Sequence, residues 1–194
     1  MSAGWPVVLD SHEVRLRPLS VRDHELWREI RQRNRSWLAP WDASVPPGTE
    51  GRPRSFTAMV RAMRWAARSG RMLPFVIEYD GKLVGQLTVN NIVRGSGQFG
   101  SVGYWIDEQY AGRGITTRAV AMAIDHCFTR VGLHRVEVAI RPENVASLRV
   151  VEKLGIEQIG YAPKYLHIDG CWRDHLIFAI TTEDAPDGLL ARLG

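Results

Sequence analysis

The segment Gln109-Tyr-Ala-Gly-Arg-Gly114 places two glycines, one residue apart, between an apolar segment and an amphipathic one. The preceding letters SVGYWI predict a strand, and the periodicity of ITTRAVAMAIDHCF predicts a helix over 115–131. The first N–H groups of a helix have no internal partner, and glycines allow an anion to approach them closely. The segment therefore predicts either a phosphate-binding turn or a tight connection between strand and helix.

Two common phosphate-binding motifs are excluded by the residues around these glycines. A dinucleotide-binding GxGxxG motif needs a third glycine at the position of Thr117, within a parallel βαβ unit. A P-loop needs a lysine directly after its last glycine, and Ile115 follows Gly114 here. The local spacing alone does not separate the remaining phosphate ligands from a plain turn.

Turn residues and periodicity predict a mixed α/β (α+β) chain around a mostly antiparallel sheet. Ser20 and Asp23 form a capping-box pattern at the start of a helix, Asp80-Gly81 marks a hairpin, and Asn144 and Gly155 bound a short helix. The expected order begins with a strand at 13–19, followed by helices at 20–38 and about 54–69 that a Pro- and Gly-rich loop at 39–53 separates. Strands at 73–80, 82–93 and 100–107 come next, followed by the helix at 115–131 and a strand at 134–140. The short helix and two or three strands within 156–180 complete the order.

Composition excludes several classes of protein. Apolar residues make up 45% of the 194 positions, charged residues 24%, and no apolar run has the length of a membrane span. No signal peptide pattern is present, so we expect a cytoplasmic protein. The two cysteines lack CxxC spacing and the histidines lack an HExxH pattern, which predicts neither a disulfide framework nor a metal site.

The net charge of +4 comes almost entirely from arginine, and it favours anionic partners such as phosphate ligands, nucleic acid or acidic proteins. Solvated helix faces are the simpler explanation for one group of arginines. In the second predicted helix, Arg61, Arg64, Arg68 and Arg71 fall on one face, while Phe56, Val60, Met63 and Ala67 fall on the other.

The glycine segment in this context resembles the acyl-CoA pyrophosphate loop of the GNAT superfamily of N-acetyltransferases, whose pattern is Gln/Arg-x-x-Gly-x-Gly/Ala. The order of predicted elements also matches that fold over about residues 12–181. The segments RNRSWLAPWDAS, GYWIDEQYAGRGITTRA, HRVEVAIRPENVASLRVVEKLGI and DGCWRDHLIFAI resemble the RimJ/RimL type of protein N-terminal acetyltransferase. The resemblance implies one acetyltransferase domain over residues 1–194, with a GNAT fold and acetyl-CoA as cosubstrate.

The resemblance also implies a set of cosubstrate-binding residues. Backbone N–H groups of the glycine segment would hold the pyrophosphate, and the preceding strand edge would pair with the pantetheine arm. Asn144 corresponds to an asparagine that hydrogen-bonds the pantetheine, a role compatible with that of a helix N-cap. The predicted residues are Tyr104, Trp105, Ile106, Tyr110, Ala111, Gly112, Arg113, Gly114, Ile115 and Asn144.

The predicted catalytic residues are less well defined. Many relatives place a tyrosine acid seven residues after the asparagine, but Val151 stands there and cannot donate a proton. RimL-like enzymes suggest Ser147 instead, which otherwise is only the third residue of a capped helix. Glu137 is the candidate general base, and its mid-strand position allows it to face either the cleft or solvent. Neither cysteine has a His–acid arrangement, so a covalent cysteine route has no support.

Trp37 and Trp41 flank a proline at the end of the first predicted helix. They either anchor a loop on the core or, as the resemblance suggests, form a wall of the amine-acceptor cleft. The favoured acceptor is a protein or peptide N-terminus, with no membrane and no direct nucleic-acid partner, and a homodimer is compatible with the family. A small-molecule amine acetyltransferase, and an acyl-CoA-binding regulatory protein with little turnover that uses its arginines, remain the alternatives.

Overall fold

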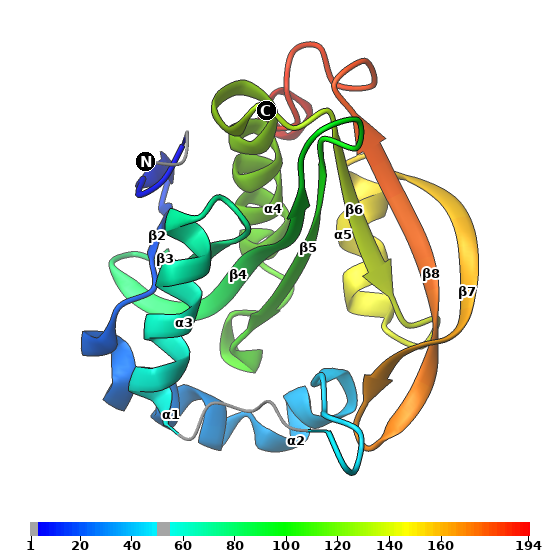
Figure 1. The fold of residues 1–194 in the computed structure, drawn as a ribbon. Coiled ribbons are helices and arrows are strands. Elements are labelled where there is room, and N and C mark those ends of the chain that lie inside the picture. The colour runs from blue at the N-terminus through cyan, green and yellow to red at the C-terminus, as the bar shows by residue number, and fades with distance from the viewer. Residues whose placement is uncertain (1–3, 50–54) are drawn as a thin grey trace.

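The computed structural model describes residues 4–49 and 55–194. In this part of the chain eight strands form a single sheet with the order β1-β2-β3-β4-β5-β6-β8-β7 (Figure 1). All neighbouring strands are antiparallel except β5 and β6, which are parallel. The strands are β1 (Leu9–Ser11), β2 (Val14–Pro18), β3 (Leu73–Tyr79), β4 (Lys82–Val93), β5 (Phe99–Ile106), β6 (Arg135–Ile140), β7 (Glu157–Ile168) and β8 (Cys171–Thr181).

Helices cover both faces of the sheet. The α-helices are α1 (His24–Arg33), α2 (Arg35–Leu38), α3 (Phe56–Arg68), α4 (Ile115–His126) and α5 (Val145–Lys153). The α4 helix contributes most of its residues to the main buried core, which also contains Phe75, Ile77 and Val138 from the strands. On the opposite face, Ile30 of α1 and Val60 of α3 pack against the strands in a smaller core. Alternating strand residues thus supply both cores.

The predicted α/β fold with a mostly antiparallel sheet is confirmed, and most local signals lie where they were expected. Ser20 and Asp23 form the capping box, although the first turn, Val21–Asp23, is a 3₁₀ helix. Strands β3 and β4 pair through the Asp80-Gly81 turn. Ser55 caps α3, while residue 54 and the loop residues 50–53 lie outside the described part of the chain.

Two helices in the structure differ in detail from the predicted ones. The helix expected over 20–38 is broken at Asn34, because the buried Asn34 side chain turns away to bond Asp107 across the molecule. The helix expected over 115–131 is α-helical only to His126, and Cys127–Val131 form a π-helical turn. Strand β1 was not expected, and 3₁₀ turns at Ala39–Trp41, Glu108–Tyr110 and Leu190–Leu193 complete the fold.

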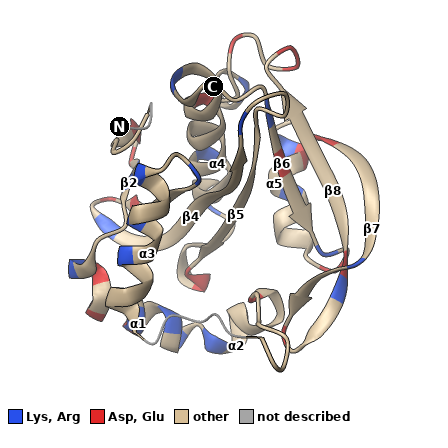
Figure 2. Cartoon of the chain, in the orientation of Figure 1, with Lys and Arg blue, Asp and Glu red and all other residues tan. Residues whose placement is uncertain are grey.

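The arginines of α3 follow the simpler expectation. Arg61, Arg64 and Arg68 are exposed on the outer face of the helix (Figure 2), opposite the buried Val60 and Ala67. Arg71 lies beyond the end of α3, and its guanidinium stacks 4.3 Å from the centre of the Trp65 ring. None of the helices in the described residues is long and apolar enough to span a membrane.

Candidate active site

The parallel strands β5 and β6 pair only at one end. Their paired positions are Phe99 with Arg135, Gly100 with Val136, and Ser101 with Glu137, although the strands continue to Ile106 and Ile140. Beyond these pairs the strands diverge, as Figure 1 shows. One edge of β5 from Val102 onward therefore has no strand partner in the described structure.

The register of β4 and β5 shows which backbone groups face this gap. The N–H of Asp107 donates to the carbonyl oxygen of Val84 on β4 at 2.8 Å. Because alternate residues of an antiparallel strand turn their backbone groups to the same side, Trp105 also faces β4, whereas Tyr104 and Ile106 face the gap. The hydrogen bond from Trp37 Nε1 to the Ile106 carbonyl, at 3.2 Å, agrees with this assignment.

The glycine segment follows directly after the free edge. Gly112 and Gly114 have φ values of +76° and +78°, and a Cβ at either position would meet no atom within 4 Å. Gly114 is the N-cap of α4 and supplies no side chain to cap it. The turn is therefore open toward the first N–H groups of α4, as an anion site requires.

Not every predicted donor in this segment is free. The N–H groups of Tyr110 and Ala111 already donate to the carbonyl oxygens of Asp107 and Glu108, at 2.9 and 3.0 Å. The N–H groups over 112–117 have no acceptor within the described residues. The donors that remain for an anion are therefore those of the two glycines and the first turn of α4.

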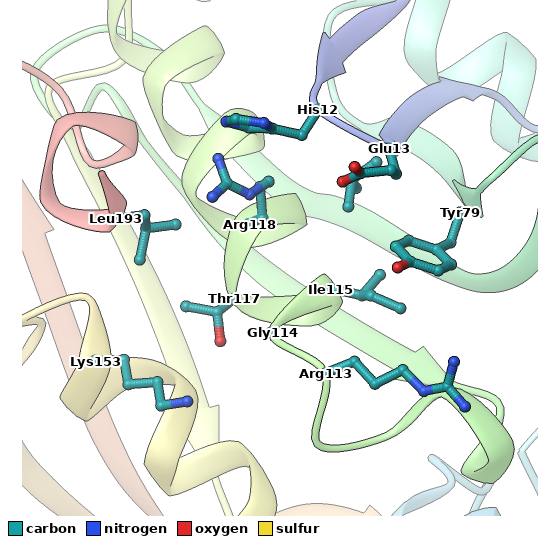
Figure 3. Close-up of a pocket in the computed structure, with 11 residues that line it drawn as sticks. His12, Glu13, Tyr79, Arg113, Gly114, Ile115, Thr117, Arg118, Lys153 and Leu193 are labelled. Carbon is teal, nitrogen blue, oxygen red and sulfur yellow. The ribbon is translucent and has the colours of Figure 1, made fainter.

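A cavity of about 350 Å³ lies around the start of α4. Figure 3 shows Arg113 and Arg118 beside it, with Lys153 reaching in from α5 and His12 and Glu13 from the turn between β1 and β2. Three of these side chains are permanent cations and only one is an acid. The cavity therefore favours a ligand with several negative charges.

The side of the gap opposite α4 and α5 is closed by residues 35–44, which we call the α2 bridge. Trp37 bonds the last residue of β5, as described above. The carbonyl of Pro40 accepts a 2.6 Å hydrogen bond from Arg141, the residue after β6, and the Trp41 ring stacks on the same guanidinium at 5.3 Å. The α2 bridge thus connects the diverged ends of β5 and β6.

The α2 bridge also contacts the β7–β8 hairpin. Ala43 forms an isolated antiparallel bridge with Ile168, and the Ser44 hydroxyl lies 2.8 Å from Nδ1 of His167. The N–H of Asp169 donates to the carbonyl of Asp42 at 3.1 Å. These contacts enclose the side of the gap away from α4 and α5.

Comparison with known proteins agrees with this geometry. A family model described as "Acetyltransferase (GNAT) domain" matches residues 13–157. The chain belongs to the GNAT acetyltransferase family. The predicted GNAT fold and acetyltransferase class are therefore confirmed.

Individual relatives within the GNAT family point to the RimJ/RimL type. The [ribosomal protein uS5]-alanine N-acetyltransferase of Escherichia coli (strain K12) is 32% identical over 172 residues, covering 87% of this chain and 88% of that protein. The probable N-acetyltransferase YjcK of Bacillus subtilis (strain 168) is 39% identical over 105 residues, 54% of this chain and 58% of that protein. The structure of Mycobacterium smegmatis RimJ in complex with CoA-disulfide is 42% identical, with a TM-score of 0.92 over 100% of this chain and 96% of that chain.

The predicted cosubstrate residues of this GNAT chain surround the gap and the glycine turn. Tyr104 and Ile106 turn their backbone groups to the gap, whereas the Trp105 side chain packs on the other face near Trp27, with ring centroids 6.2 Å apart. Asn144 is the N-cap of α5, and its Oδ1 accepts from the Ser147 N–H at 3.1 Å. Its Nδ2 has no partner in the described structure and is free to donate.

The candidate catalytic residues lie on opposite faces of the sheet. Asn144 caps α5 by accepting from the Ser147 backbone N–H, so the Ser147 hydroxyl is not used by the cap. Glu137 points away from the face of Val136 and Val138, and its carboxylate forms a 2.8 Å ion pair with Arg135. Whether either residue takes part in catalysis remains a prediction.

Cys127 is fully buried, and burial raises the pKa of its thiol to about 12, so it stays an unreactive thiol. Within the described residues no three His, Cys, Asp or Glu side chains lie where they could share a metal ion.

Several residues near the site escaped the sequence reasoning. Arg141 is held between Pro40 and Trp41, and Asn34 and Asp107 meet beneath the turn. His175 is buried on β8, its Nδ1 donates to the Arg173 carbonyl at 3.0 Å, and burial lowers its pKa so that the imidazole stays neutral. The pattern HLIFAI predicted the strand, but nothing in the sequence indicated that Arg141 continues the neighbouring strand toward the same face.

Proposed function

We propose that this chain transfers the acetyl group of acetyl-CoA to the α-amine of a protein or peptide N-terminus. The observation that supports this most directly is the gap between β5 and β6. It has the open glycine turn and a cationic cavity on its α4 side and the aromatic α2 bridge on the opposite side. The named activity of the Escherichia coli relative, on a ribosomal protein, supports an acceptor of the same class.

The residues present suit CoA. The N–H groups of Gly112 and the following turn would hold the pyrophosphate, where the open space beside each glycine leaves room for it. Arg113, Arg118 and Lys153 would neutralise the remaining phosphate charge. The free edge of β5 and Nδ2 of Asn144 would pair with the amide groups of the pantetheine arm. The Mycobacterium smegmatis RimJ structure, a complex with CoA-disulfide, supports a ligand of the CoA class.

Acetyl-CoA supplies an acetyl group activated as a thioester, and this chain's residues would do the rest. The N–H of Tyr104 or Ile106 would donate to the carbonyl oxygen as it gains negative charge. The acceptor amine must be neutral to attack, and a free α-amine has a pKa of about 7.7–8.0, so a weak base is sufficient. Glu137 is the candidate for that base and Ser147 the candidate for proton donation to the leaving sulfur.

The acceptor would enter beside the α2 bridge. Trp37 and Trp41 are part-buried and fixed at either end of the bridge by their contacts with Ile106 and Arg141. Rigid aromatic rings there would form apolar walls for the first side chain of a peptide. We also propose that the chain forms one acetyltransferase domain that acts in the cytoplasm without metal or nucleic acid, alone or as a homodimer.

The experiment that tests this compares acceptors. A short peptide with a small first residue is assayed against the same peptide with its α-amine blocked and a lysine left free, and against small amines. We expect turnover only with the free α-amine. Equal rates on the blocked peptide or on small amines would refute Nα selectivity, and CoA binding without turnover on any acceptor would favour a regulatory protein.

A further inference from the structure

The hydroxyl group of Tyr104 is buried and has no hydrogen-bond partner within the described residues. Burial raises the pKa of this group to about 12, and the Ser147 side chain partly opposes the rise. Ser147 therefore lies close by, although the two hydroxyl groups do not meet in hydrogen-bond geometry. Buried polar groups without partners are rare in folded proteins, because their desolvation is not compensated.

The position of Tyr104 relates this hydroxyl to the gap. Its backbone faces the gap from β5, and its ring packs against the core on the side of α4 and α5. Ser147 belongs to the first turn of α5, which starts just beyond the end of β6. The hydroxyl thus lies on the α4–α5 face of the sheet, near the start of α5. Val151, one turn further along α5, is buried and apolar and offers no donor there.

We propose that the Tyr104 hydroxyl donates a hydrogen bond to the thioester sulfur and stabilises it as the leaving thiolate. This inference rests on the proposed acetyl transfer. The amine nitrogen forms a bond to the carbonyl carbon, the C–S bond breaks, and its electron pair stays on sulfur. The amine releases its proton to the base, for which Glu137 is the candidate, and the thiolate takes one from Ser147, the candidate acid, or from solvent, so charge and protons balance.

The acidities explain why Tyr104 acts as a hydrogen-bond donor rather than by giving up its proton. A free thiol has a pKa of about 8.5, well below that of the buried Tyr104 hydroxyl, so the proton remains on oxygen. The hydroxyl is therefore a donor across the whole neutral range. A hydrogen bond to an anion is stronger than one to a neutral group, so the contact strengthens as the thiolate forms.

The matched variants are Tyr104→Phe and Tyr161→Phe. Phenylalanine at position 104 keeps the ring and removes only the unpaired hydroxyl, so we expect an unchanged melting temperature and an unchanged KM for acetyl-CoA. The kcat should fall roughly 10- to 100-fold, the effect of one hydrogen bond to a charged group. Tyr161 lies on the exposed face of β7, where its hydroxyl bonds Asp174, and its variant should keep wild-type kcat.

A second readout needs no acceptor. CoA is bound to each protein, and its thiol is titrated by the ultraviolet absorbance of the thiolate. If Tyr104 donates to the sulfur, the bound thiol in wild type and in Tyr161→Phe should have a lower pKa than in Tyr104→Phe, by about one to two units. If Tyr104 serves only the fold, the bound thiol should have the same pKa in all three proteins.

The outcomes separate the inference from the proposed function. Equal kcat and equal thiol pKa in wild type and Tyr104→Phe would overturn the role of Tyr104, as would a clear loss of thermal stability with an unchanged thiol pKa. A Tyr104-dependent thiol pKa in a wild-type protein that acetylates no amine would support the contact with sulfur and refute acetyl transfer. Failure of the wild type to bind CoA would overturn both.

Discussion

Asn34 Nδ2 donates a buried hydrogen bond of 2.9 Å to Asp107 Oδ1, although the two residues are 73 positions apart in the chain. In return, Oδ1 of Asn34 accepts from the Glu108 N–H at 2.9 Å. Asn34 is the residue between α1 and the α2 bridge, and Asp107 is the first residue after β5. The pair therefore joins the segment that closes one side of the gap to the segment that leads into the glycine turn.

Replacing Asn34 with alanine should affect both sides of the gap. The Asp107 carboxylate, which is fully buried, loses one donor, and about 1–3 kcal/mol of unfolding free energy should be lost with it. We expect KM to rise for the peptide and for acetyl-CoA together, measured by steady-state kinetics. The exposed neighbour Gln32→Ala is the control. A rise in only one of the two KM values would contradict the idea that Asn34 holds both the α2 bridge and the glycine turn.

The glycine turn should be sensitive to a single methyl group. Gly112→Ala places a Cβ in the open space of the turn and forces a non-glycine residue to φ +76°, which costs about 1–2 kcal/mol. Gly132→Ala imposes the same strain at φ +75°, also with no atom within 4 Å, away from the turn. Both variants should lose similar stability by thermal unfolding, but only Gly112→Ala should lose CoA affinity by calorimetry. Equal CoA affinities in the two variants would contradict an anion-binding role and leave the turn as a connection between β5 and α4.

Trp37→Phe should weaken use of the acceptor. The substitution keeps an aromatic ring but removes the Nε1–H bond to the Ile106 carbonyl, so the α2 bridge loses its attachment to β5. We expect a several-fold higher KM for peptide with little change in the KM for acetyl-CoA. Trp65→Phe on α3, where the ring is 63% exposed, should leave both values unchanged. A changed KM for acetyl-CoA with an unchanged KM for the peptide would contradict a role of Trp37 in acceptor binding.

The structure separates two roles of Ser147. Because the cap on α5 uses the Ser147 backbone N–H, Ser147→Ala keeps the cap, whereas Asn144→Ala removes it at a cost of about 1 kcal/mol. If the hydroxyl donates a proton, Ser147→Ala should lower kcat roughly 10²–10⁴-fold with intact stability and CoA affinity. A loss of kcat below about threefold would leave Ser147 with no role beyond its place in the helix.

Stability should fall in mild acid, in part because of His126. Burial lowers the pKa of this residue, and its Nε2 donates to the Gly4 carbonyl at 2.8 Å. The unfolded chain, with a histidine pKa of about 6.5, therefore binds a proton that the folded protein resists. The stabilising contribution is complete above that pKa and is lost as the pH falls below it. His126→Gln keeps a donor and cannot titrate, so its chemical-denaturation midpoint should depend less on pH between about 7 and 5.

Short-range signals in the sequence predicted the local structure well, because their partners lie within a few residues. Ser20 with Asp23, and Asn144 with Ser147, are such pairs. The strand–glycine–helix order likewise predicted the position of the open turn at the start of α4. The α2 bridge depended on long-range partners instead: Trp37 and the Ile106 carbonyl are 69 positions apart. No periodicity encodes such a contact, so the sequence predicted a role for the two tryptophans but not which atoms hold them.

The contact between the α2 bridge and the β7–β8 hairpin has a consequence for the order in which the molecule is made. Ser44 and His167 are separated by 123 positions. Closing so long a loop is entropically costly and yields no contact until both ends exist, so such pairings form late in folding. During synthesis the glycine turn emerges well before β8, whereas the enclosure around the α2 bridge must wait for the hairpin. A chain interrupted before residue 167 would contain the glycine turn but not the enclosure around the α2 bridge, so the two sides of the gap are completed at different times.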